Sequence, residues 1–298
     1  MPPVYATADI GSNTVHLLIA QVNGTGITRL RNDSEWLSLG EVVSREGFIP
    51  PDLERKLLST LKSYSAAASA LKAEGLYVFA TEAMRVAKNH DEILARIRRQ
   101  IGVEVDLISA RREAELSIAG VQLDTSAPGP WALIEVGGGS AQVARCREDG
   151  VMTDEISLPL GTGRLIVEAS LTQPSHEDQR RDLENFIRHQ TAVCRDLDPV
   201  SRVVASGGVS RGLWRAVHPD GGRSLAVQEL EYLQWASARI NIETICRRFG
   251  VKAKRASTLL PGSTVFLELL RLFGQTSMTV SEFGVREGAI MEMARCRA

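Results

Sequence analysis

Apolar residues recur at the spacings typical of strands and of helices along the chain. The order of predicted strands and helices in the first half of the chain is repeated in the second half. Apolar strands are predicted at 4–10 and 14–22, and a turn at 23–26 leads into a third strand that ends near Leu39. Behind two prolines, four leucines at helical spacing predict a helix. The remaining predicted elements are a strand at 76–80, a helix at 90–102, a strand at 103–108 and a helix at 111–121.

The second half follows a segment rich in turn residues at 123–130. The predicted strands lie at 131–136, 140–146, 151–158, 203–205 and 278–283, and the predicted helices lie near 163–171, 174–194, 227–249, 262–273 and 285–298. Such a repeated order predicts a duplicated α/β fold with mixed sheets, in which ligands bind at strand ends between the domains. We expect domains at 1–124 and 125–298, with the closing helix able to pack back on the first domain.

Each half opens with the same motif, at 8–14 and at 134–140: an apolar strand reaches a carboxylate, then a glycine-containing turn and a second apolar strand. Glycine lets the backbone come close to an oxyanion, so that successive N–H groups can converge on one phosphate. For either turn alone, a hairpin without a ligand is an equally good interpretation. The pair favours two phosphate-binding loops that face a shared cleft. The predicted phosphate-binding residues are Gly11, Ser12, Asn13, Thr14, Gly137, Gly138, Gly139 and Ser140.

Two acidic residues, Asp9 and Glu135, stand inside these apolar strands. Burying a carboxylate is costly unless it is paired or bound to a metal. A hydrated Mg²⁺ usually takes one or two carboxylates together with phosphate oxygens, so the pair is a candidate Mg²⁺ site. The alternative is that each acid accepts local hydrogen bonds and organises its turn.

Three further places could contribute to phosphate chemistry. Glu113 is predicted in the first turn of a helix, where it could serve as a general base or only favour the helix dipole, and spacing alone does not decide. Arg85 follows a buried strand and could bind a phosphate, although a surface salt bridge is the usual role of such an arginine. Lys254 and Arg255 could line a path for a long polyanion or form a solvated face. For His16, a structural role in its strand is the expectation.

Composition excludes several classes of protein. At 298 residues two domains are favoured, and 44% hydrophobic with 24% charged residues is typical of a globular protein. A net charge of −1 provides no overall field to attract nucleic acid or a membrane surface. The four cysteines are far apart, which argues against a disulfide framework or zinc site, and no apolar run approaches membrane-spanning length. We expect a cytoplasmic protein.

Seven segments, in this order, resemble the exopolyphosphatase / guanosine pentaphosphate phosphohydrolase (Ppx/GppA) family over nearly the whole chain. They are 9–14 with 16–20, 81–85 with Asn89, 108–116, 135–140, 205–208, 255–262 and 284–288. The resemblance implies duplicated actin-like domains of the ribonuclease H-like, sugar kinase/Hsp70/actin superfamily, with mixed five-stranded sheets and an interdomain cleft. It also implies Mg²⁺-dependent hydrolysis of the terminal phosphate of inorganic polyphosphate or of guanosine pentaphosphate, with Glu113 at the position of the family's catalytic glutamate.

Two positions depart from the family pattern, and the chain resembles the family's short form. Glu135 stands where the family usually has Asp, and Gln142 stands where it usually has Glu, which removes one negative charge near the implied metal. A sensor that binds polyphosphate or an alarmone without turnover therefore remains an alternative. An ATP-dependent kinase of the same superfamily is a separate alternative. The sequence leaves open the preferred substrate, the preferred polymer length and whether the protein is a homodimer.

Overall fold

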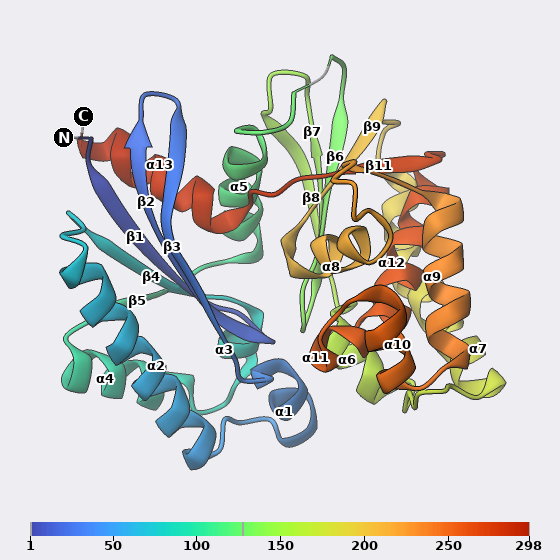
Figure 1. Cartoon of the computed structure of the whole chain (residues 1–298), viewed down its shortest axis with the longest axis horizontal. Helices are drawn as coiled ribbons and strands as arrows, with labels where there is room; N and C mark the ends of the chain where they lie inside the picture. Colours follow the sequence, from blue (N-terminus) through green and yellow to red (C-terminus); the bar gives the residue numbers. More distant parts are fainter. Residues whose placement is uncertain (1, 127, 298) are drawn as a thin grey trace. The chain divides into compact units, whose positions relative to one another are not determined.

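The computed structural model describes residues 2–126 and 128–297, which form two compact units (Figure 1). Unit 1 contains Met1–Leu123 and Phe283–Ala298, and unit 2 contains Asp124–Glu282. The chain therefore passes from unit 1 to unit 2 and returns for its last helix. In the described part of the chain, no helix combines the length and the apolar character that crossing a membrane requires.

Unit 1 is built on a five-stranded mixed sheet of order β3-β2-β1-β4-β5. Strand β1 pairs antiparallel with β2 and parallel with β4, β2 pairs antiparallel with β3, and β4 pairs parallel with β5. The strands are β1 (Val4–Ile10), β2 (Thr14–Asn23), β3 (Gly26–Trp36), β4 (Leu76–Ala80) and β5 (Val105–Leu107).

Helices cover both faces of this sheet (Figure 1). They are α1 (Leu39–Glu46), α2 (Pro51–Ala70), α3 (Glu82–Val86), α4 (His90–Ile101), α5 (Ala110–Val121) and α13 (Val285–Arg297). Leu17 of β2 belongs to the same buried cluster as Leu57 of α2, whereas Leu18 belongs to that of Ile290 on α13. Alternate residues of β2 thus face opposite layers, which explains why β2 reads as an almost continuous apolar run.

Unit 2 contains a six-stranded mixed sheet of order β10-β11-β9-β6-β7-β8. Its strands are β6 (Trp131–Val136), β7 (Ala141–Cys146), β8 (Met152–Leu158), β9 (Arg202–Ser206), β10 (Ser224–Ala226) and β11 (Ser277–Val280). From β8 to β11 the order repeats that of β3 to β5 in unit 1, with the same parallel and antiparallel pairings. The predicted duplicated α/β fold is confirmed, and the prediction of five strands is corrected to six for this sheet by the short antiparallel edge strand β10.

The core of unit 2 forms around α12, whose residues are mostly buried and which packs against α6, α7, α8 and α9. The helices are α6 (Thr162–Glu168), α7 (Glu177–Thr191) with a 3₁₀ turn at Ala192–Asp196, α8 (Gly207–Val217), α9 (Val227–Arg239), α10 (Ile242–Phe249), α11 (Ala253–Ala256) and α12 (Leu259–Leu272).

Two short helices of unit 1 were not predicted. The third strand ends at Trp36 rather than near Leu39, because Leu39 opens α1. Helix α3 occupies the segment after β4, for which no element was predicted. Both helices are shorter than three turns, so their apolar residues do not establish a helical period.

Candidate functional site

The candidate residues of unit 1 come from the edge of the sheet at which its parallel strands end, here called the carboxyl edge. Ile10 of β1 is in register with Ala80 of β4, and Ala80 with Leu107 of β5. Beyond this row, Thr81 N donates to Ile10 O at 3.1 Å and Ile108 N donates to Ala80 O at 3.1 Å. The segments that follow β1, β4 and β5 therefore leave the sheet side by side.

Loop 1, residues 11–14, is a tight turn between β1 and β2. Its ends are closed by the hydrogen bond from Gly11 N to Thr14 O at 3.0 Å. The carbonyl of Ser12 accepts from Gly40 N at 2.7 Å, and that of Asn13 accepts from Leu37 N at 3.0 Å. The chain just before and within α1 thus holds the carbonyl side of the turn, a support that the sequence pattern did not indicate.

Side chains at loop 1 are held by neighbours on the same edge. Ser12 Oγ donates to Glu82 Oε2 at 3.2 Å, which ties the loop to the start of α3. The Thr14 hydroxyl lies 2.7 Å from Nε2 of His16. Asp9 is half-buried, one residue before the end of β1, and stands opposite His16 in the β1–β2 register.

Arg85 and Glu113 are brought together although 28 positions separate them in the sequence. Arg85 Nη1 donates to Ile108 O at 2.7 Å and lies 3.4 Å from Glu113 Oε2. The Glu113 side chain is 15% exposed and that of Arg85 is 21% exposed, so both are reachable from solvent. Glu113 lies in the first turn of α5, as predicted, and Ser109 Oγ caps this helix by accepting from Arg112 N.

Loop 2, residues 137–140, repeats the design of loop 1 in unit 2. Gly137 N donates to Ser140 O at 2.9 Å. The start of α6 holds its carbonyls, since Thr162 N donates to Gly137 O at 2.9 Å and Gly163 N to Gly138 O at 2.8 Å. Gly161 makes this approach possible, because a Cβ there would lie 2.2 Å from the carbonyl carbon of Gly139.

Glu135 is half-buried near the end of β6 and lies against the first residue of α8. A Cβ on Gly207, whose φ is +91°, would lie 3.0 Å from Glu135 Oε1. Gln142 stands opposite Glu135 in the register, is 3% exposed, and donates from Nε2 to Ser140 Oγ at 3.1 Å. A neutral amide therefore supports loop 2 at this position.

Lys254 and Arg255 both belong to α11 but differ in their exposure to solvent. Lys254 is exposed, whereas Arg255 packs on α8, so that a Cβ on Gly208 would lie 3.1 Å from its Nη1. Burial lowers the pKa of Arg255, and the nearby charge of Arg215 lowers it further. Because α8 follows β9 directly, Arg255 reaches the end of the unit 2 sheet from which Glu135 also projects.

Metal binding can be judged from the donor chemistry of these residues. In residues 2–126 and 128–297, no three His, Cys, Asp or Glu side chains are grouped so that they could hold a metal ion. Asp9 and Glu135 nevertheless each place one half-buried carboxylate beside a glycine-containing turn. Oxygen donors in this small number suit Mg²⁺, which completes its shell with water and phosphate oxygens. The residues present therefore fit such an ion.

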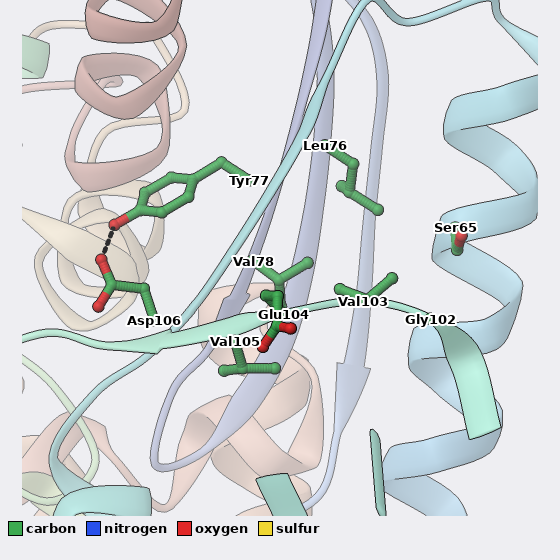
Figure 2. Close-up of a pocket in the computed structure, with 9 residues that line it drawn as sticks. All are labelled: Ser65, Leu76, Tyr77, Val78, Gly102, Val103, Glu104, Val105 and Asp106. Carbon is green, nitrogen blue, oxygen red and sulfur yellow. Dashed lines mark hydrogen bonds between the residues drawn. The ribbon is translucent and has the colours of Figure 1, made fainter. Parts of the chain in front are cut away.

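A separate cavity of about 460 Å³ lies at β4, β5 and Ser65 of α2, away from these residues (Figure 2). On it, Tyr77 Oη donates to Asp106 Oδ2 at 2.7 Å. Burial raises the pKa of Tyr77, and the hydrogen bond to Asp106 raises it further. No predicted site residue lines this cavity, and it offers no phosphate-binding turn.

Within unit 1, therefore, the fold brings Asp9, loop 1, Arg85 and Glu113 to one sheet edge. Within unit 2, it brings Glu135, loop 2 and Arg255 to the corresponding edge. Sequence reasoning assigned no role to the residues behind the loops, which are Gly40, Glu82, Gly161 and Gly207. The Gly161-Thr162-Gly163 stretch and the Gly207-Gly208 pair were available signals of a close backbone approach.

Comparison with known proteins places these observations in context. A model of the Ppx/GppA phosphatase family matches residues 18–296. The chain is 28% identical to a Streptomyces coelicolor protein that is named as uncharacterized, over 96% of this chain and 89% of that protein. It is 27% identical to exopolyphosphatase 1 of Mycobacterium leprae, over 95% of this chain and 87% of that protein. The crystal structure of the Aquifex aeolicus member of the Ppx/GppA family superposes with a TM-score of 0.85 at 27% identity, covering 99% of this chain and 98% of that chain.

Proposed function

Because the chain belongs to the Ppx/GppA phosphatase family, we propose that it removes the terminal phosphate of inorganic polyphosphate, with guanosine pentaphosphate as a second substrate. The observation that carries the proposal is the Arg85–Glu113 pair, held at the same sheet edge as loop 1. A carboxylate and a guanidinium beside an anion-binding turn are the groups that water attack on a phosphate requires.

In the proposed reaction, the backbone amides of loop 1 bind the terminal phosphate of the chain, and loop 2 is a second phosphate-binding turn. Glu113 orients a water molecule and accepts its proton as the water oxygen attacks the terminal phosphorus. The bond from that phosphorus to the bridging oxygen breaks, and the shortened chain leaves with the bridging oxygen. Arg85 offsets the negative charge on the equatorial oxygens. The products are orthophosphate and a chain shorter by one phosphate.

Asp9 and Glu135 are the residues that would hold Mg²⁺. When bound, the ion neutralises charge on the phosphate oxygens of the substrate. The chain's own contribution is to keep both carboxylates beside the glycine turns, with His16 opposite Asp9 and Gln142 opposite Glu135.

We also assign Lys254 and Arg255 to the path of the polymer beyond its terminal phosphates, since Arg255 reaches the strand-end region of unit 2 and Lys254 is exposed next to it. Lys254→Glu should raise KM for long polyphosphate and leave KM for tripolyphosphate unchanged, because only the long chain extends past loop 2. Lys62→Glu, at another exposed lysine, on α2, is the matched control. Equal effects on both chain lengths would remove Lys254 from the path.

A sensor that binds without turnover is the second candidate, and Gln142 is the observation that favours it. Its buried amide replaces a carboxylate beside loop 2, and this weakens the attraction for a divalent cation. Ligand binding would survive such a change better than catalysis that depends on the ion.

One assay separates these functions. Phosphate release is measured side by side from polyphosphates of graded length, guanosine pentaphosphate and ATP, with Mg²⁺ and with excess chelator. We expect Mg²⁺-dependent release from polyphosphate. Tight binding of polyphosphate without release would favour the sensor, and phosphoryl transfer from ATP to a small acceptor without polyphosphate hydrolysis would favour a kinase.

A further inference from the structure

The contact between Thr14 and His16 has a chemical consequence for loop 1. Thr14 is the last residue of the loop, and its carbonyl closes the turn by accepting from Gly11 N at 3.0 Å. Its hydroxyl oxygen lies 2.7 Å from Nε2 of His16, two residues further along β2 and therefore on the same face of the sheet. Both side chains are half-buried.

A threonine hydroxyl has one proton to donate, so the direction of this hydrogen bond matters. If Thr14 donates to an unprotonated Nε2, its proton is used within the protein, and only lone pairs face a ligand. If Nε2–H donates to Thr14, the hydroxyl proton is available to an acceptor outside. A phosphate oxygen can only accept, and it therefore requires the second arrangement.

An anion bound at loop 1 favours the His16 tautomer that carries its hydrogen on Nε2. Across the sheet, His16 is in register with Asp9 on β1 and Ser34 on β3. The anion near loop 1 adds negative charge beside Thr14, and this charge favours an N–H group, rather than a lone pair, directed at the hydroxyl. A lone pair of Thr14 facing a phosphate oxygen would be repulsive.

We propose that His16 is a positioning residue for phosphate binding: its Nε2–H donates to Thr14 Oγ1 and thereby directs the hydroxyl proton of Thr14 to a phosphate oxygen. This inference rests on the proposed function, because it takes loop 1 as a phosphate-binding turn. It assigns a role to a histidine that touches neither the substrate nor the reacting water.

The test uses the full chain and calorimetric binding of inorganic tripolyphosphate, together with KM and kcat for its hydrolysis. Gln and Asn variants suit position 16, because the amide nitrogen of Gln reaches the place of Nε2 and that of Asn does not. His16→Gln should bind tripolyphosphate within about threefold of the wild type, and His16→Asn should bind about tenfold more weakly, since no N–H group then orients the Thr14 hydroxyl proton toward the charged phosphate oxygen. The loss should fall on KM more than on kcat.

A double-mutant cycle separates this role from a general structural one. Thr14→Val should weaken binding about tenfold, and adding His16→Asn to it should cause no further loss, because the hydroxyl that His16 directs is gone. Multiplied losses in the double variant, or unchanged affinity of His16→Asn, would overturn the inference. Circular dichroism melting shows that each variant is folded at the assay temperature.

Binding and phosphate release together distinguish a failure of this inference from a failure of the proposed function. A wild-type protein that binds tripolyphosphate but releases no phosphate contradicts the hydrolase proposal and leaves the role of His16 measurable by calorimetry. A wild-type protein that does not bind tripolyphosphate overturns both.

Discussion

Arg85 is a single side chain that connects three parts of the candidate site. Arg85 belongs to the last turn of α3, the helix that follows β4, and its guanidinium donates to the backbone after β5 and faces the Glu113 carboxylate. A planar guanidinium with five donors can keep its contacts with the backbone and with Glu113 and still donate to a phosphate oxygen. A lysine ammonium cannot match that geometry.

Arg85→Lys should therefore lower kcat/KM for polyphosphate by about 10- to 100-fold, the equivalent of one lost charged hydrogen bond. Steady-state phosphate release measures this. Arg111→Lys is the control, since Arg111 is 62% exposed and pairs with Glu115 on the helix surface. If Arg85→Lys kept wild-type kcat/KM, Arg85 would be only a structural salt bridge.

His218 links pH to the stability of unit 2. It lies between Asp220 Oδ1 at 3.2 Å and Glu229 Oε1 at 3.0 Å. Burial lowers the pKa of His218, but the hydrogen bonds to Glu229 and Asp220 outweigh burial and raise the pKa above its usual value. The charged form is thus favoured in the folded state, and the stabilisation is complete below the unfolded pKa and lost as pH rises through the folded pKa.

The melting temperature of His218→Gln should consequently fall below that of the wild type at about pH 6, and the difference should shrink by about pH 8.5. Thermal unfolding at both pH values measures it. His189→Gln, at an exposed histidine of the same unit, should show no such trend. A difference between wild type and His218→Gln that grows with pH would contradict this reading of the two carboxylates.

Among the elements, the two loops share one design: a glycine turn whose carbonyl side is held by the chain that enters the next helix. Backbone amides from 37–40 hold loop 1, and amides from 162–164 hold loop 2. With the carbonyls bonded on one side, each turn has a fixed shape before any ligand binds, which reduces the entropy lost on binding.

Gly161→Ala should disturb this support, because its Cβ would lie 2.2 Å from the backbone of loop 2. We expect the free energy of unfolding to fall by about 1–3 kcal/mol, as for other overpacked sites, and the affinity for polyphosphate to fall with it. Urea unfolding and calorimetry measure the two effects. Gly26→Ala is the matched control, since its Cβ would meet nothing closer than 3.8 Å. Identical behaviour of the two variants would contradict the role assigned to Gly161.

Sequence periodicity predicted the strands that carry the loops, because β1, β2, β6 and β7 are long apolar runs bounded by glycine turns. It also placed Glu113 in the first turn of α5. Periodicity could not predict the pairing of Glu113 with Arg85, because that contact depends on the register of β4 with β5. It also missed β10, a three-residue edge strand that is too short to show alternation.

At the scale of the whole molecule, the two units share a duplicated topology but carry different functional side chains. Five strands of each sheet follow the same order, and in each unit the first strand carries a carboxylate near its end and is followed by a glycine-containing turn. In unit 1, the segment after β5 leads into α5, whose first-turn Glu113 pairs with Arg85 of the helix that follows β4. In the corresponding place after β11, the chain returns to unit 1 as α13, which packs against α5 through the Arg112–Glu292 ion pair and a close approach at Gly288.

Water activation is therefore assigned to one residue, Glu113 of unit 1. The direct measurement is phosphate release from polyphosphate by Glu113→Gln, compared with wild type and with Glu115→Gln, whose side chain is 41% exposed on the same helix. We predict that Glu113→Gln keeps the wild-type melting temperature and polyphosphate affinity but releases phosphate about 10²- to 10⁴-fold more slowly, while Glu115→Gln keeps the wild-type rate. Phosphate release by Glu113→Gln at the wild-type rate would contradict the account.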